Sequence, residues 1–88
     1  MRPAVVEIAR WAVLWRSVRT VCSEERHFMF DGGGVVLRKS RREAREWIDK
    51  HYSYLRTRPD LRREPFGWRM PRAVKVKVTV EELIDEQT

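Results

Sequence analysis

The polar candidates for covalent or acid–base chemistry in the sequence are Cys22, His27, Asp31, Ser40 and His51. A cysteine or serine nucleophile needs a general base within hydrogen-bond distance, and histidine is the usual base. The spacing of these residues matches no catalytic motif, and a lone cysteine is more often a small buried residue than a nucleophile. We therefore predict no catalytic residues and a protein that is not an enzyme.

The sequence also offers little to hold a metal or a cofactor. Two histidines and one cysteine are too few for a tetrahedral zinc site, which normally takes four nitrogen or sulfur ligands. Gly32, Gly33 and Gly34 lack the spacing of a phosphate-binding loop, and they do not stand between a strand and a helix. We predict no metal and no cofactor.

The clearest chemical feature is positive charge. The formal net charge is +6, and fifteen arginines accompany only four lysines. Residues 38–72 carry twelve basic and five acidic side chains, so the charge is concentrated in the middle of the chain. The planar arginine fork grips phosphate or carboxylate well. A genome with GC-rich codons would also raise the arginine content, so composition alone does not establish a function.

Two groups of basic residues are candidates for contacting nucleic acid. One precedes and enters a predicted helix, whose N-terminal N–H groups also attract phosphate. The other lies on one face of a predicted strand. If folding brings the groups together, they would neutralise several phosphates and give salt-dependent binding. The alternative is that these basic residues only form a solvated surface, because acidic residues are interleaved with them. The candidates are Arg38, Lys39, Arg41, Arg42, Lys75 and Lys77.

A second group of residues fits a protein partner instead. Phe66, Trp68, Arg69 and Met70 are of the types enriched at the centres of protein interfaces. The alternative is that Phe66 and Trp68 close the core, and we favour it because a small domain needs every large side chain. A regular strand at 73–80 also offers an edge for pairing with a second copy, giving a homodimer.

The first half of the chain is predicted to be mainly strand. Tryptophan and valine enrichment favours a strand over 11–21, while residues 4–9 read equally as a helical lead-in or the start of that strand. Residues 23–26 are predicted to form a polar turn. Short apolar runs at 27–30 and 35–37 flank an Asp-Gly-Gly-Gly sequence. This arrangement predicts a hairpin with a three- to four-residue loop or a bulge.

One helix and one further strand follow. Ser40 and Glu43 form a capping box, in which Glu43 is expected to reach back to the N–H of Ser40. Pro59 should end the helix at about residue 57. Residues 59–72 are predicted to be a long connection that packs on the domain. Strict alternation then predicts a strand at 73–80, before an acidic tail at 81–88. The predicted apolar stripe of the helix is Ala44, Trp47, Ile48, His51 and Leu55.

These elements predict one α+β domain over residues 1–80, in the order β-β-β-α-β. A small, mostly antiparallel sheet of three to four strands should carry the single helix on one face. We expect the valines of the last strand to face that helix.

The stretch from Val36 to Ile48, VLRKSRREAREWI, resembles the strand-to-helix junction of the AP2-like, arm-type DNA-binding domains of phage integrases. Those domains place a three-stranded sheet before one helix and insert the sheet into the major groove. The resemblance implies that outward side chains of the strands at 11–21 and 27–38 read DNA, Arg16 or Arg19 and Arg38 among them. The chain departs from the family in its proline-rich loop, in the strand after the helix and in lacking an integrase catalytic domain. The added strand would compete for the sheet edge or face that the family uses.

The sequence thus predicts a small, non-catalytic binding protein whose arginine-rich surface contacts DNA or RNA. The alternative is a protein-interaction module or inhibitor, such as a phage or mobile-element protein that acts on a host protein complex. No apolar run approaches the roughly 20 residues that span a bilayer, so no membrane association is expected. A single cysteine excludes an internal disulfide and fits a reducing compartment, and we expect a cytoplasmic location.

Overall fold

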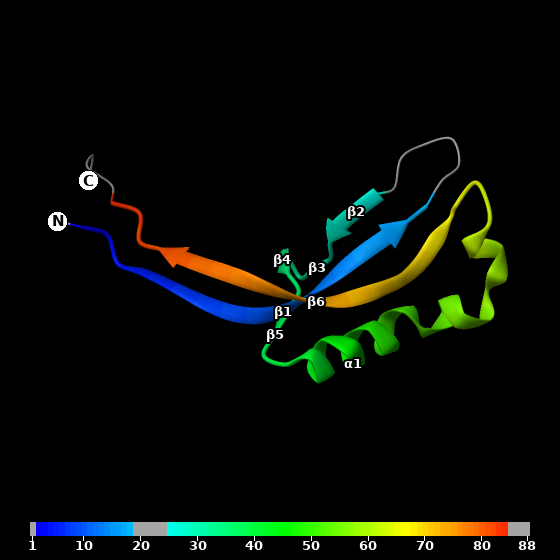
Figure 1. Cartoon of the computed structure of the whole chain (residues 1–88), viewed down its shortest axis with the longest axis horizontal. Helices are drawn as coiled ribbons and strands as arrows, with labels where there is room; N and C mark the ends of the chain where they lie inside the picture. The colour runs from blue at the N-terminus through cyan, green and yellow to red at the C-terminus, as the bar shows by residue number, and fades with distance from the viewer. Residues whose placement is uncertain (1, 19–24, 85–88) are drawn as a thin grey trace.

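A long antiparallel ribbon of two strands dominates the computed structural model, which describes residues 2–18 and 25–84 (Figure 1). Strands β1 (Val5–Ser17) and β6 (Trp68–Glu81) pair from one end to the other. Alternating β-branched residues favour this extended conformation. Residues 5–9 are therefore strand, which decides the open question about the start of the chain.

The other edge of β1 carries two shorter strands. β2 (Glu25–Phe28) pairs with the end of β1, and β5 (Leu37–Arg38) pairs with its middle. Between them, β3 (Phe30–Asp31) and β4 (Gly34–Val35) form a small separate hairpin. Its turn has two residues, Gly32 and Gly33, with φ of 62° and 89°. The hairpin prediction is confirmed, with a tighter turn than the three- to four-residue loop that we expected.

Helix α1 (Arg41–Tyr52) starts at the predicted cap. The Glu43 N–H donates to Ser40 Oγ at 3.2 Å, while the Glu43 carboxylate accepts from the N–H of Lys39 at 3.1 Å, one residue before the expected donor. Two 3-10 helices follow, η1 (Ser53–Thr57) and η2 (Pro59–Arg62). Helical geometry therefore runs to Thr57 and breaks before Pro59, as the proline predicts.

The core lies between α1 and one face of the ribbon. Val13 of β1 and Val36 pack with Ala44, Trp47 and Ile48 of the helix, all buried. The α+β prediction, with an antiparallel sheet and one main helix, is confirmed. One residue of the predicted helix stripe differs. His51 is exposed, and its ring lies against Trp47 with 4.4 Å between ring centroids.

The valines of the last strand face away from the helix, so our prediction for them was wrong. Val13 lies opposite Ala73, and Ala73 packs against the core. Because side chains alternate between faces, Val74 and the valines at 76, 78 and 80 project from the other face. The small Ala73 side chain fits under the helix, and period-two alternation alone does not tell which face the helix covers.

Strand β6 also begins earlier than predicted. Residues 68–72, which we expected in a connection, pair with β1, and Leu14 lies opposite Arg72. The register shifts between Leu14 and Arg16, and Pro71 lies in β6 beside this irregularity. Proline is tolerated in strands at such interruptions and at edges. The expectation that this segment packs on the domain is met by the buried Pro71.

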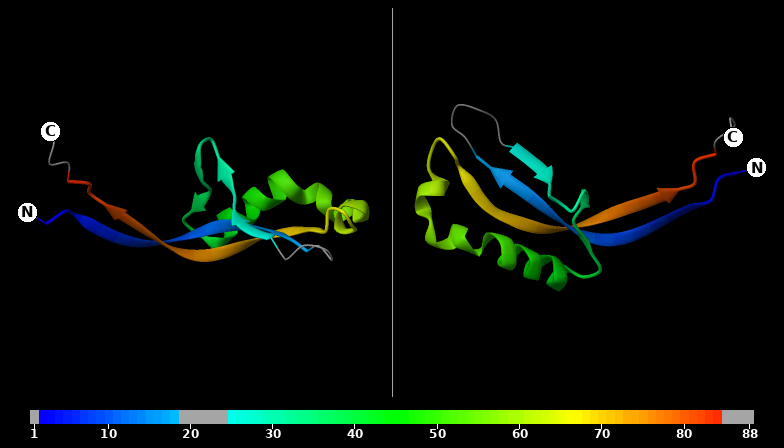
Figure 2. Two further views of the ribbon diagram at one scale, coloured as in Figure 1. Left: turned by 90° about the horizontal axis from the view of Figure 1, so that it is seen from above. Right: turned by 180° about the vertical axis from the view of Figure 1, so that it is seen from behind.

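The ribbon extends well beyond the core as an arm, formed by residues 5–9 of β1 and 77–81 of β6 (Figures 1 and 2). The molecule measures 56 × 31 × 20 Å along its principal axes. Val5, Val6 and Val80 in the arm are 56%, 52% and 54% exposed. The N–H of Glu82 donates to the Ala4 carbonyl at 2.8 Å and closes the far end of the ribbon.

Candidate nucleic-acid interface

Three cations from three different elements surround Trp11 on one face of the sheet. Trp11 of β1 lies opposite Lys75 of β6 on one side and opposite Arg38 of β5 on the other. Directly opposite residues of antiparallel strands project from the same face. Arg41, at the start of α1, places its guanidinium carbon 5.9 Å from the centroid of the indole. We call Trp11, Arg38, Arg41 and Lys75 the Trp11 cluster.

A groove of about 400 Å³ adjoins the cluster between α1 and β6. Arg41, Arg45, Arg56 and Arg72 line it, together with Asp49. The Asp49 carboxylate accepts from Arg56 at 2.7 Å, so one acid neutralises one arginine. Arg41, Arg45 and Arg72 form no ion pair with any other residue that the structure describes. The groove therefore has an excess of positive charge, and its arginine forks suit phosphate or carboxylate oxygens.

The basic face continues along the arm for one more step. Lys77 lies two residues beyond Lys75 on the same face, opposite Ala9. Its ammonium nitrogen is 3.8 Å from the Glu7 carboxylate, and both side chains are largely exposed. Such an exposed pair is weak. Lys77 extends the positive surface, while Glu7 marks its far limit.

Three of the predicted basic residues that the structure describes, Arg16, Lys39 and Arg42, lie apart from the Trp11 cluster and its extension at Lys77. The Arg16 guanidinium donates twice to the Met70 carbonyl, at 3.0 and 3.3 Å, and so links β1 to β6. Arg42 lies on a neighbouring face of the helix and pairs with Glu46 at 3.2 Å. Lys39 is exposed beside the cap of α1, and Arg19 lies outside the described residues.

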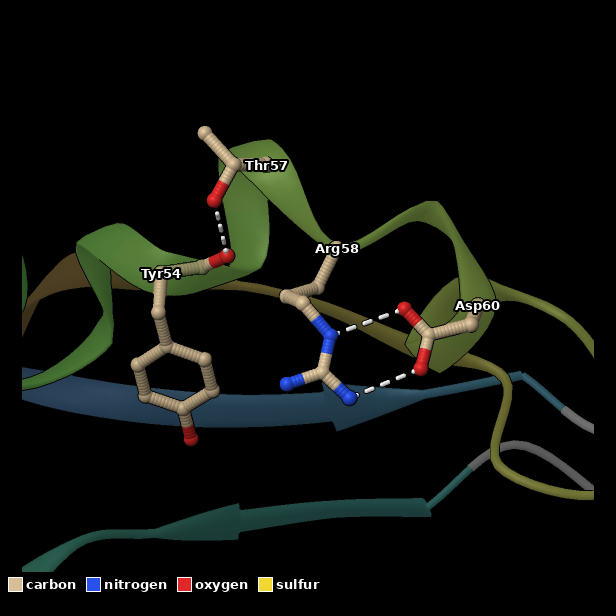
Figure 3. Close-up of polar contacts among 4 residues, drawn as sticks. All are labelled: Tyr54, Thr57, Arg58 and Asp60. Atoms are coloured by element: carbon tan, nitrogen blue, oxygen red, sulfur yellow. Dashed lines mark hydrogen bonds and ion pairs between the residues drawn. The ribbon is translucent and has the colours of Figure 1, made fainter.

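Part of the charge after the helix is already neutralised within its own segment. Arg58 donates to both carboxylate oxygens of Asp60, at 2.9 and 2.8 Å (Figure 3). These hydrogen bonds lower the pKa of Asp60 and raise the pKa of Arg58. Nearby, Thr57 Oγ1 donates to the Tyr54 carbonyl at 3.1 Å and fixes the last turn of η1. Arg58 is consequently a poorer candidate for a ligand than Arg41 or Arg45.

The candidate protein-binding residues lie mostly within the fold. Trp68 is half-buried, and its ring meets Trp15 edge-on at 5.5 Å between centroids. Met70 packs against the core. Arg69 donates to two backbone carbonyls, those of Trp68 and Arg62. Only Phe66, 41% exposed, offers a substantial apolar surface among the four candidates.

The residues considered for catalysis or metal binding do not gather in the described part of the chain. No group of three or more His, Cys, Asp or Glu side chains comes together there. Cys22 lies outside the described residues. Asp31 accepts a hydrogen bond from the Trp47 indole N–H at 3.3 Å, and Ser40 serves as the helix cap.

Sequence reasoning missed Trp11, Arg45 and Arg72 as parts of the basic surface. The spacing of Arg41 and Arg45, four residues apart, does place both on one helix face. Trp11 and Lys75 are 64 positions apart, and only the pairing of β1 with β6 brings them together. No local pattern in the sequence reveals that contact.

Comparison with known proteins adds nothing to this geometry. The chain matches no protein-family model, no curated protein and no solved structure. The resemblance to integrase arm domains therefore stays a hypothesis. No helix in the described residues has the length and apolar character needed to cross a membrane.

Proposed function

We propose that this protein is a non-catalytic nucleic-acid-binding protein that contacts the phosphate backbone through the Trp11 cluster and the adjoining arginine groove. The observation that carries the proposal is the position of Arg41, which lines the groove together with Arg45 and Arg72 and also lies over Trp11, the residue opposite Lys75. Each phosphate contact releases counterions, so several such cations together give measurable, salt-dependent affinity.

Next to the Trp11 cluster the sheet narrows to the two-stranded arm. A two-stranded β-ribbon fits the major groove of B-form DNA, which is roughly 12 Å wide, and this favours double-stranded DNA over double-stranded RNA. The major groove of A-form RNA is too deep and narrow for side chains to read. In this arrangement Lys75 and Lys77 on the ribbon approach the groove, and Arg41 and Arg45 on the helix meet the phosphates.

An acidic protein surface is the second candidate ligand. It is favoured by one specific observation, namely that three arginines without an ion pair among the described residues line one groove. A guanidinium fork binds a carboxylate as well as it binds a phosphate.

Fluorescence anisotropy with labelled duplex DNA, single-stranded DNA and duplex RNA tests the proposal. We expect the duplex DNA to bind, with affinity that falls steeply between about 50 and 200 mM salt. The double variant Arg41→Ala/Arg45→Ala should bind much more weakly and reduce the slope of log K against log salt by about 2. The matched control is Arg42→Ala/Lys50→Ala, which also removes two positive charges, from exposed positions of the helix outside the groove, and should bind nearly as well as the parent.

Absence of binding to all three probes at low salt would refute the proposal. Equal losses for Arg41→Ala/Arg45→Ala and for Arg42→Ala/Lys50→Ala would show that binding depends on net charge rather than on this site. Circular dichroism confirms that each variant folds. Arg41 and Arg45 are exposed, so neither substitution should disturb the core.

A further inference from the structure

Strand β6 has a free outer edge along the arm. Among the described residues β6 pairs only with β1, and α1 lines the groove beside residues 70–73 of β6. Residues 75–81 therefore have backbone N–H and C=O groups on one side without a strand partner (Figure 2). Their register against β1 is continuous and contains no bulge or proline. Isolated two-stranded ribbons are only marginally stable, and bare regular edges readily pair with another strand.

The side chains of this edge are complementary to a second copy of themselves in one antiparallel register. With a two-fold axis at Val78, Lys75 of one copy lies opposite Glu81 of the other. Val76 then lies opposite Val80, and Lys77 lies opposite Thr79. Directly opposite residues of unlike charge, and paired β-branched residues, stabilise antiparallel strands. We propose that the protein forms a two-fold dimer by pairing residues 75–81 of β6 in this register.

Other registers and the other edge fit less well. An axis at Lys77 opposes two lysines, and an axis at Val76 opposes Lys75 to Lys77. An axis at Thr79 does pair Lys77 with Glu81, but within β6 it overlaps only residues 77–81 and sets Lys75 against Leu83. On the free edge of β1, an axis at Glu7 sets the two Glu7 side chains opposite each other. No register in which opposite residues project from the same face sets Glu7 against an arginine of this strand.

The geometry of such a dimer avoids collisions. Seven paired residues overlap over about 23 Å, at about 3.3 Å per residue. The helix lies beside the part of β6 that precedes this overlap, so the two bodies stand at opposite ends. The two-fold axis passes through the plane of the combined sheet, so the Trp11 clusters of the two copies lie on the same face of it. The dimer does not depend on nucleic-acid binding, and because it makes the arm four-stranded, only the monomer presents a two-stranded ribbon to DNA.

Exchange of the two charges tests the proposal. We expect sedimentation equilibrium to show a dimer for the parent protein. Lys75→Glu and Glu81→Lys should each weaken it by at least tenfold, because each sets like charges opposite one another. The double variant Lys75→Glu/Glu81→Lys restores both pairs and should regain the dimer. Lys50→Glu, an equal change on the exposed surface of α1, is the control and should leave the dimer intact.

A cysteine pair tests the register itself in a Cys22→Ser background. Val78→Cys places the two thiols directly opposite each other, so a short bifunctional thiol reagent should link the chains. Val80→Cys places them about 13 Å apart and should not link. A parent protein that stays monomeric, single charge variants that dimerise normally, or linking at position 80 but not at 78 would each overturn the proposal. DNA binding measured on Arg41→Ala/Arg45→Ala is independent of all three outcomes.

Discussion

At Gly67 both the backbone conformation and a close neighbouring carbonyl group exclude a side chain. Replacement of this glycine by alanine is therefore a stringent test of the fold. Its φ of +60° lies in the left-handed region, and an added Cβ would overlap the carbonyl oxygen of Val18. At the same point the Val18 N–H donates to the Gly67 carbonyl at 2.7 Å, tying the end of β1 to the start of β6. Alanine here must strain the backbone and displace this contact.

The magnitude follows from two costs and one gain. The left-handed conformation costs an alanine about 1–2 kcal/mol. Loss of the hydrogen bond costs about 1–1.5 kcal/mol. The less flexible unfolded chain returns about 0.4–1 kcal/mol. We therefore expect Gly67→Ala to lower the free energy of unfolding by about 2 kcal/mol, which for a domain of this size lowers Tm by about 8–16 °C.

Substitutions at two other glycines separate the conformational cost from the clash with Val18. Gly33 has a φ of +89°, but no atom lies within 4 Å of an added Cβ, so Gly33→Ala meets only the conformational cost. Gly34 has neither a positive φ nor a neighbour within 4 Å, and Gly34→Ala should be close to neutral. Urea unfolding followed by tryptophan fluorescence gives all three values. If Gly67→Ala destabilises no more than Gly33→Ala, the predicted clash with Val18 is wrong.

Two further predictions concern the helical segment. Ser40→Ala removes the acceptor for the Glu43 N–H and should cost about 1 kcal/mol of unfolding free energy in a denaturant titration, whereas Ser40→Asp should retain most of it. The lowered pKa of Asp60 means that the unfolded chain takes up a proton first as pH falls, so stability should decline below pH about 4, through the folded pKa of Asp60. Asp60→Asn should flatten that decline in thermal melts at successive pH values, and an unchanged decline would contradict the role assigned to the Arg58 pair.

Features with local causes could be predicted from the sequence. Two glycines after Asp31 supply the positive φ values of a tight hairpin turn, and the hairpin is there. Ser40 and Glu43 satisfy free N–H groups within four residues of each other, and the helix starts at that point. In both cases a short stretch of chain contains the groups that decide the structure.

Features set by distant partners could not be predicted in the same way. The alternation at 73–80 identifies a strand, but the helix-covered face is chosen by Ala73 and Val13, which meet only after β1 and β6 pair. The strand also extends back to Trp68 because β1 offers a partner there, against the local signal of Pro71. The candidate site has the same origin, since Arg38, Arg41 and Lys75 become neighbours only around Trp11.

Trp11 belongs to both the core and the basic surface, and this has a consequence for the design of variants. Trp11 packs partly against the buried cluster around Val13, while Arg41 lies over its ring. Removing the indole would therefore change stability and the position of the cations together, and a lost activity could not be assigned to either. Arg45 and Lys75 contact the ligand in our proposals but are exposed, so their substitution alters charge without removing core packing. Substitutions at Arg45 and Lys75 can therefore test binding without changing the fold, whereas a substitution at Trp11 changes both.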